Sequence, residues 1–364
     1  MRSGILSEQL HSPRACAKTS ATRPSLEIKN CVPNRDAATA FASRPGVETD
    51  TMIYEHITNF AGKPVITWEA QSGIQDPEGA CYALRLSYEE ADEGRRWTDK
   101  FAAFLDDPSS NRVSGIVIGD WGLLSSAMDE TSTPVVDALV AARDCLPNLR
   151  AIFFGDIIGE ECEISWIRQS DISPLFTAYP QLEHFCVRGA DGLSLGALKH
   201  DGLKSLIIQS GGLGVNVVRE VAAADLPELE HLELWLGEEN YGGDATVADL
   251  APILDGGLFP KLKYLGLRDS QIADEIARAV ATAPVVERIR VLDLSLGTLT
   301  DEGAAALLAS PAIARLEKLD VHHHFCSEEM TAKLQSLGVE VDASEREKPD
   351  IYGDEVWRYV AVGE

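Results

Sequence analysis

Four potential metal ligands stand close together near the C-terminal end of the chain: His322, His323, His324 and Cys326. Imidazole and thiolate groups are preferred ligands of zinc and nickel. Consecutive residues of a strand point to opposite faces, so three adjacent histidines cannot converge on one ion. The sequence also has no second Cys/His pair at metal-site spacing. We therefore expect a polar strand end, and a metal site at His322, His324 and Cys326 stays as the alternative.

A second group of candidate residues is acidic. Glu160, Glu161 and Glu163 stand beside Trp166 in the segment GEECEISWI. Paired carboxylates can carry out acid–base catalysis or bind a hard cation. No partnering base, nucleophile motif or calcium-loop spacing accompanies them, so we expect a solvated acidic loop and keep an enzyme as the alternative. The Gly-rich run 209–214 lacks the lysine of a phosphate-binding loop and the spacing of a dinucleotide fingerprint. We expect a turn there, and no cofactor.

The elements that would position such residues are indicated by a recurring phrase, apolar-Pro-x-Leu-x-x-apolar-x-apolar. Copies of this phrase, from clear to degenerate, begin near residues 113, 146, 179, 202, 226, 259, 286 and 313. A phrase that returns at intervals of roughly 20 to 50 residues marks a stack of repeats, in contrast to a single closed core. A doubly wound sheet is the alternative, but that fold does not require the same residue pattern in each strand.

Each repeat predicts one strand and one helix. The apolar positions after the central leucine fall two residues apart, as Leu232 and Leu234 do after Leu229, which predicts a strand with one buried face. Between strands the pattern becomes helical, with Thr300 and Ser173 as predicted caps. One such unit cannot bury its own apolar face. We therefore predict an α/β solenoid of about 7 or 8 stacked repeats with parallel strands.

The phrase LxxLxL followed by a helix such as TDEGAAAL resembles leucine-rich repeats of the ribonuclease-inhibitor type, over about residues 112–341. The resemblance implies a horseshoe with parallel strands on the concave face and helices on the convex face. More narrowly, IGDWG, GEECEISWI, GTLTDEGAAALLAS, LDVHHHFCSEEM and EVWRYVAVGE are similar to segments of a family of uncharacterised bacterial leucine-rich-repeat proteins. Members of that family sit beside enzymes of a modification pathway, which implies a partner from such a pathway.

Four regions follow from the composition and the repeat positions. Residues 1–51 are slightly basic, lack any sustained period and predict a disordered extension. Residues 52–111 predict an α+β N-terminal capping module, residues 112–341 the solenoid, and residues 342–364 an acidic link with a capping strand. We expect Trp357, Tyr359, Val360 and Val362 to pack against the last repeat or the adjacent loop. A peptide motif that docks into another protein is the alternative.

The charge of the chain restricts its partners. The 364 residues carry a formal net charge of −26, which repels nucleic acid and anionic membrane surfaces and favours a basic partner. No apolar run in the sequence approaches the length needed to span a bilayer. The 7 scattered cysteines without a CxxC pair are typical of free thiols in the cytosol. We expect a cytoplasmic protein, and no oligomeric state is predicted.

A row of predicted strand residues alternates with the buried positions and therefore faces the concave side. Trp235 and Tyr264 stand on neighbouring repeats with Arg268 nearby, and these residue types most often dominate binding energy at interfaces. We predict an exposed contact patch for a protein or peptide, and hence a non-catalytic scaffold; the alternative is that these side chains cover one another. The complete row comprises Phe153, His184, Cys186, Arg188, His231, Glu233, Trp235, Tyr264, Arg268, Asp293, Ser295, Lys318, Asp320 and His322.

Overall fold

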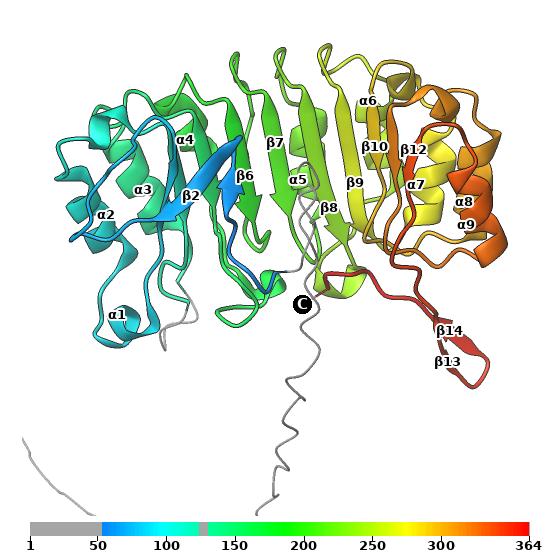
Figure 1. The fold of residues 1–364 in the computed structure, drawn as a ribbon, viewed down its shortest axis with the longest axis horizontal. Coiled ribbons are helices and arrows are strands. Elements are labelled where there is room, and N and C mark those ends of the chain that lie inside the picture. Colours follow the sequence, from blue (N-terminus) through cyan, green and yellow to red (C-terminus); the bar gives the residue numbers. More distant parts are fainter. Residues whose placement is uncertain (1–52, 124–129, 364) are drawn as a thin grey trace, which may run out of the picture. The chain divides into compact units, whose positions relative to one another are not determined.

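A computed structural model describes residues 53–123 and 130–363 of the chain. The chain divides into two compact units, Met1–Thr49 and Asp50–Glu364. The first unit and the predicted extension 1–51 lie outside the described residues. The second unit is built on one open sheet of 12 strands that follow one another in sequence order (Figure 1). Strands β1 and β2 pair antiparallel, and the neighbouring pairs from β2 to β12 are parallel.

The strands of this sheet are short, and a separate pair of strands follows them near the end of the chain. The bounds are β1 (Asn59–Phe60), β2 (Lys63–Thr67), β3 (Cys81–Leu84), β4 (Gly115–Ile118), β5 (Ala151–Phe154), β6 (His184–Arg188), β7 (Ser205–Gln209), β8 (His231–Gly237), β9 (Tyr264–Ser270), β10 (Val291–Asp293), β11 (Lys318–Asp320), β12 (Glu340–Asp342), β13 (Asp350–Tyr352) and β14 (Glu355–Trp357).

Helices α3 to α9 cover one face of the sheet and lie behind the strands in Figure 1. We call this face convex and the opposite, helix-free face concave. The bounds are α1 (Tyr88–Asp92), α2 (Trp97–Leu105), α3 (Thr133–Ala141), α4 (Ser173–Ala178), α5 (Val215–Ala222), α6 (Val247–Leu254), α7 (Ala273–Val280), α8 (Asp301–Ala309) and α9 (Glu328–Gln335). Among the described residues, no helix combines the length and the apolar character needed to cross a bilayer.

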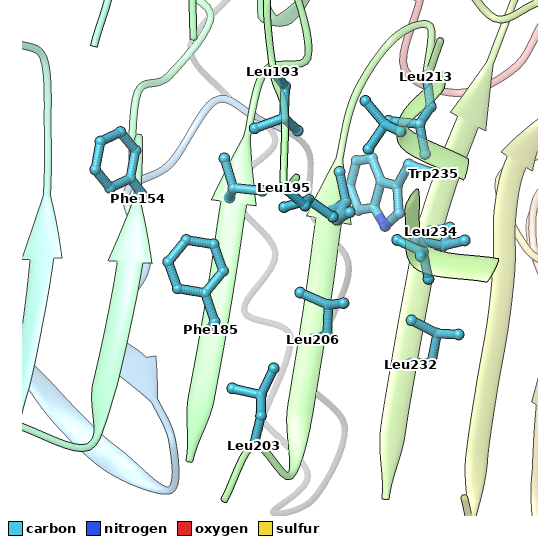
Figure 2. Packing of buried hydrophobic residues seen from close by; sticks show 14 of the residues in the cluster. Phe154, Phe185, Leu193, Leu195, Leu203, Leu206, Leu213, Leu232, Leu234 and Trp235 are labelled. Atoms are coloured by element: carbon cyan, nitrogen blue, oxygen red, sulfur yellow. The ribbon is translucent and has the colours of Figure 1, made fainter. Parts of the chain in front are cut away.

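The register of the sheet reproduces the sequence phrase. Leu206, Leu232, Leu265, Leu292 and Leu319 pair across consecutive strands from β7 to β11, and none of them is exposed to solvent. Figure 2 shows part of this layer, with Leu206 of β7 beside Leu232 and Leu234 of β8. Each such side chain contributes about 1.5–3 kcal/mol by leaving water. The predicted α/β solenoid with leucine-rich repeats is confirmed.

Helix starts are tied to the neighbouring repeat. The hydroxyl of Thr300 accepts a hydrogen bond from the amide of Glu302, as predicted for a cap of α8. Asp274 of the preceding helix also accepts from the Thr300 amide (2.8 Å), so it links two repeats. Ser173 does not cap α4, because it is the first helical residue, and Asp171 accepts from its amide instead (2.9 Å).

The C-terminal tail, residues 358–363, returns to the middle of the solenoid, as the red segment in Figure 1 shows. The amide of Ala361 donates to the carbonyl of Leu296 (2.8 Å), and Val360 and Val362 are buried. The predicted packing against the last repeat is therefore wrong in place, and Trp357 and Tyr359 remain 46% exposed. The Gly-rich run 209–214 explains the close approach, because a Cβ at Gly211 would lie 2.4 Å from the Gly363 carbonyl oxygen.

Candidate functional site on the concave face

The concave face is divided into an apolar half and a charged half. In strands β3 to β5, and at Cys186 of β6, the residues that alternate with the main core are themselves apolar and buried. They form a second, smaller hydrophobic cluster on the concave side, which comprises Phe60, Cys81, Ala83, Val117, Ala151, Phe153 and Cys186. Both faces of these strands are therefore covered, as is usual for parallel strands.

The cover over the apolar half is the first described segment of the chain, residues 53–61. Its strand β1 turns back into β2 through Ala61 and Gly62, which both have positive φ (50° and 71°), as a tight hairpin turn requires. The ring of Phe60 packs edge-on against Phe153, with centroids 5.5 Å apart. Phe153 is only 4% exposed. The prediction that Phe153 is free to contact a partner is wrong, because the chain's own segment lies on it.

Asp156, at the end of β5, holds this segment in place. Its carboxylate is fully buried and accepts two hydrogen bonds from Arg85, from Nε (2.8 Å) and from Nη2 (2.5 Å). The amide of Ile57 donates to the other carboxylate oxygen (3.3 Å). Burial would raise the pKa of Asp156, but His56 and the arginines outweigh that effect and lower it. We call Asp156, Arg85 and His56 the Asp156 cluster.

His56 bridges two carboxylates. Its Nδ1 lies 3.3 Å from Asp156 Oδ2, and its Nε2 lies 3.4 Å from Glu161 Oε1. Both are ion-pair distances, and Nδ1 makes no hydrogen bond of good geometry with the described residues. Burial alone would lower the pKa of His56, but the two carboxylates raise it to about 9. The histidine is therefore a cation at neutral pH, and it ties segment 53–61 to the loop after β5.

Arg188 belongs to the same region and is not available to a partner. Its guanidinium donates to the Ile157 carbonyl (Nη1, 2.8 Å) and to Gln209 Oε1 (Nε, 2.9 Å). It also lies 3.7 Å from Asp156 and 5.3 Å from the centre of the Phe153 ring. The residue is 5% exposed. The expectation that Arg188 projects toward a ligand is wrong, because these contacts use it to bind β5, β6 and β7 together.

The acidic loop after β5 contacts segment 53–61 through Glu161. Besides the contact with His56, Glu161 accepts a hydrogen bond from the amide of Ile158 (3.1 Å), whereas Glu160 and Glu163 are exposed. Glu160 and Glu161 line an open pocket of about 340 Å³ together with His56 and Arg85. Of its charged lining residues, His56 and Arg85 belong to the Asp156 cluster, Glu161 contacts His56, and Glu160 faces solvent. The remaining one, Glu69, lies 3.7 Å from Lys100. This arrangement favours a structural role for the loop over the acid–base alternative.

The charged half of the concave face is organised as a row of carboxylates. Glu233, Asp293, Asp320 and Asp342 occupy one register position across β8, β10, β11 and β12, and Gly266 occupies it in β9. A Cβ at Gly266 would lie 3.1 Å from Glu233 Cγ. Glycine therefore leaves room for the side chains that gather over β9. Glu233 is 6%, Asp293 5% and Asp320 6% exposed, and Asp342 is half-buried, so the prediction that the first three project freely toward a partner is wrong. Arg268, Lys318 and His322 lie among these acids, and this carboxylate strip is a largely buried ionic network with a small excess of negative charge.

Arg268 and Trp235 fill the middle of the strip. Arg268 donates to Glu233 Oε1 (Nη1, 3.1 Å) and Ser295 Oγ (Nε, 2.9 Å), and it lies 3.5 Å from Asp293. The indole of Trp235 also donates to Glu233 Oε1 (2.6 Å), and Arg268 stands 5.3 Å from the ring centre. Each residue is 4% exposed. The predicted exposure of Trp235 is wrong; the alternative, in which these side chains cover one another, describes the structure.

Tyr264 and His231 form the more accessible edge of the strip. Their rings stack with centroids 3.9 Å apart, and both residues are half-buried. The Tyr264 hydroxyl donates to Asp293 Oδ2 (2.6 Å) and lies 3.3 Å from Glu233 Oε2. Burial and the nearby carboxylates raise the pKa of Tyr264 well above its usual range. His184, in the apolar half, is also half-buried, and burial lowers its pKa.

The far end of the strip combines a lysine with potential metal ligands. Ligand atoms of Asp320, His322 and Asp342 all lie within 4.8 Å of one another. Lys318 Nζ lies 2.6 Å from Asp320 Oδ2, and His322 Nδ1 lies 2.6 Å from Asp320 Oδ1. Burial would raise the pKa of Asp320, but these two cationic partners lower it to about 2. Both oxygens of Asp320 are thus engaged by protein groups.

The predicted metal set of His322, His324 and Cys326 is not assembled. His324 is buried, its Nε2 lies 3.1 Å from the Ala343 carbonyl, and its Nδ1 accepts a hydrogen bond from the Cys326 amide (3.1 Å). Cys326 is buried as well, and burial raises its thiol pKa to about 12. These two residues stabilise the turn after β11, as expected for a polar strand end, while His322 faces the carboxylate strip.

Several residues of these sites were not predicted. Asp342 had a signal in the sequence, because an Asp closes the strand in LDLS, LDVH and VDAS alike. Asp156, Arg85 and His56 had none, because they come from three separate segments and meet only in the folded chain.

Comparison with known proteins gives an extensive match among the solved structures. No protein-family model and no curated protein match the sequence. A solved Bacteroides fragilis protein, a target of the Northeast Structural Genomics Consortium, shares 33% sequence identity with a TM-score of 0.71, over 78% of this chain and 77% of that chain. An internalin from Listeria monocytogenes matches with 12% identity over 69% of this chain and 72% of its own, with a TM-score of 0.30.

Proposed function

The chain belongs to the same family as the Bacteroides fragilis protein, and we propose that it is a non-catalytic scaffold that binds a protein or peptide with a basic surface. The observation that supports this most directly is the row of four carboxylates on the charged half of the concave face, at Glu233, Asp293, Asp320 and Asp342. Complementary charge guides encounter and fixes orientation at interfaces.

The division of the concave face restricts where the partner binds. Segment 53–61 already covers the apolar half. A partner would therefore bind to the charged half, from β8 to β12. There the four carboxylates outnumber the neighbouring cations Arg268, Lys318 and His322 by one. The partner is therefore expected to offer Lys or Arg side chains, and its affinity is expected to fall as salt screens the charges.

The chemistry of the strip favours binding over catalysis. A general acid or base works best with a pKa near the working pH. The pKa of Asp320 is lowered to about 2, and that of Tyr264 is raised well above its usual range, so neither exchanges protons readily at neutral pH. We place the scaffold in the cytoplasm, where its thiols would persist. The described cysteines are free: Cys81, Cys145, Cys162, Cys186 and Cys326.

The test compares two double variants that each remove two negative charges from the full chain. Asp293→Asn with Asp320→Asn neutralises the strip, while Asp144→Asn with Glu302→Gln neutralises exposed carboxylates away from it, with side chains 87% and 81% exposed. Each is used as bait in cells of the source organism at low salt. We expect a stoichiometric partner with wild type and the second variant but not with the first. A partner retained by the strip variant would refute the proposal.

A further inference from the structure

The strands β13 and β14 form a hairpin that buries no face. All residues from Asp350 to Tyr359 are exposed. They include large apolar side chains, with exposures of 70% for Ile351, 64% for Tyr352, 51% for Val356, 46% for Trp357 and 46% for Tyr359. In Figure 1 the hairpin projects away from the 12-stranded sheet. Scattered surface hydrophobics need no explanation, but a contiguous group of this kind marks an interaction site.

The pairing of the strands places apolar groups on both sides of the hairpin. Ile351 pairs with Val356, so these two side chains share one face. Tyr352 and Trp357 alternate with them and therefore point to the opposite face. A partner that encloses the hairpin would consequently contact two apolar surfaces at once.

The hairpin is held at both ends although its middle is bare. Before it, the amide of Glu347 donates to the His324 carbonyl (2.8 Å), and Arg346 pairs with Glu328 (3.0 Å). After it, the buried tail is fixed, with the amide of Val362 donating to Asp269 (2.9 Å). An isolated two-stranded hairpin is at best marginally stable in water. Because both of its ends are fixed to the solenoid, this hairpin is an ordered, exposed element and differs from a frayed terminus.

The charges of the hairpin indicate what covers it. Among the exposed residues Asp350 to Tyr359, three are acidic, Asp350, Asp354 and Glu355, and one is cationic, Arg358. A second copy of the chain would bring the same three acids and another net charge of −26, and would be repelled. A partner with basic residues around an apolar groove matches both the charge and the apolar side chains.

We propose that hairpin 350–357 is a docking element for a different protein, which receives it in an apolar groove bordered by Lys or Arg. Tyr and Trp are the residue types that most often supply hot spots, and truncation of a hot spot weakens binding by at least about 30-fold. This surface is separate from the carboxylate strip. A result that refutes one of the two proposals therefore leaves the other untouched.

The test places a photo-crosslinking benzoylphenylalanine at Tyr352 of the full chain in cells of the source organism. A matched control carries the same group at Tyr88, which is 72% exposed on α1. We expect position 352, and not position 88, to crosslink to a second protein, at a surface where mass spectrometry finds apolar residues next to Lys or Arg. With that protein purified, Trp357→Ala should weaken binding at least about 30-fold.

Two further variants show which surface the crosslink depends on. Ile351→Ser with Val356→Ser should abolish the crosslink without changing the melting temperature, because both side chains are exposed. Asp293→Asn with Asp320→Asn should leave the crosslink intact, because the carboxylate strip is a different surface. Crosslinks to a second copy, to the solenoid of the same chain, equally from position 88, or none at all would overturn the proposal.

Discussion

The replacement His56→Gln tests the Asp156 cluster through its pH dependence. A pKa raised from 6.5 to about 9 means that the protonated histidine stabilises the docked segment 53–61 by about 3 kcal/mol. The side chain is 29% exposed, so solvent screens the interaction only in part. Glutamine keeps the size and one donor but cannot carry the charge that both Asp156 and Glu161 require.

The direction of the effect follows from the raised pKa. The stabilisation is fully present below pH 6.5, because the histidine is then protonated in both the docked and the released segment. It disappears as pH rises through about 9, where the docked histidine also loses its proton. Relative to wild type, the variant should therefore release the segment about 200-fold more often at pH 6, but only about 2-fold more often at pH 9.

Amide hydrogen exchange at Gly159 measures this release directly, because its amide donates to the Ile53 carbonyl (2.6 Å). Wild type and variant are compared at the same pH, so intrinsic exchange rates cancel. His231→Gln serves as the control, because His231 lies in the charged half and should leave Gly159 protection unchanged. An equal loss of protection at pH 6 and pH 9 in His56→Gln would show that the charge of the histidine does not hold the segment.

Other substitutions test burial elsewhere. Arg85→Met should lower the free energy of unfolding by about 3–5 kcal/mol, because it leaves the buried Asp156 carboxylate poorly paired; Arg150→Met, at an exposed pair, should change it by less than about 1 kcal/mol in the same urea titration. Trp235→Ala should cost about 3–5 kcal/mol, and an unchanged melting temperature would contradict its burial. Asp269→Asn should protect the tail amides better than wild type at pH 8 and equally near pH 4, since burial raises the pKa of Asp269 and its charged form is disfavoured; weaker protection at pH 8 would contradict this.

The sequence predicts the solenoid well, because its determinants are local and repeated. The leucines that pair across β7 to β11 recur in each phrase, and a period of two identifies the buried face of each strand. The cap at Thr300 is predictable for the same reason, since capping depends on a few adjacent residues. The cap of α4 is not at Ser173, because Asp171 two positions earlier supplies the acceptor instead.

The state of the concave face depends on contacts that periodicity cannot report. Phe153 occupies the predicted row but is covered by a segment almost a hundred residues away, which the bond from Ile57 to Asp156 also anchors (99 positions apart). Arg188 is engaged by the Ile157 carbonyl and by Gln209. One local signal does exist: CYAL, GIVI and AIFF lack polar alternation, which is typical of strands buried on both faces. For Trp235, the neighbouring Glu233 and Arg268 provide the cover, and their mutual packing follows from register alone.

Because the two halves of the concave face differ, a repeat from one half is not equivalent to a repeat from the other half. A unit such as the one around β4, transplanted to the position of β10, would present Val117 where Asp293 now meets Tyr264 and Arg268, and would leave those polar groups unmatched. We accordingly expect the insertion or deletion of a whole module to destabilise the protein less within one half than across the junction. The junction between β6 and β8, where the inner surface changes from apolar to charged, is the point at which the order of modules is fixed.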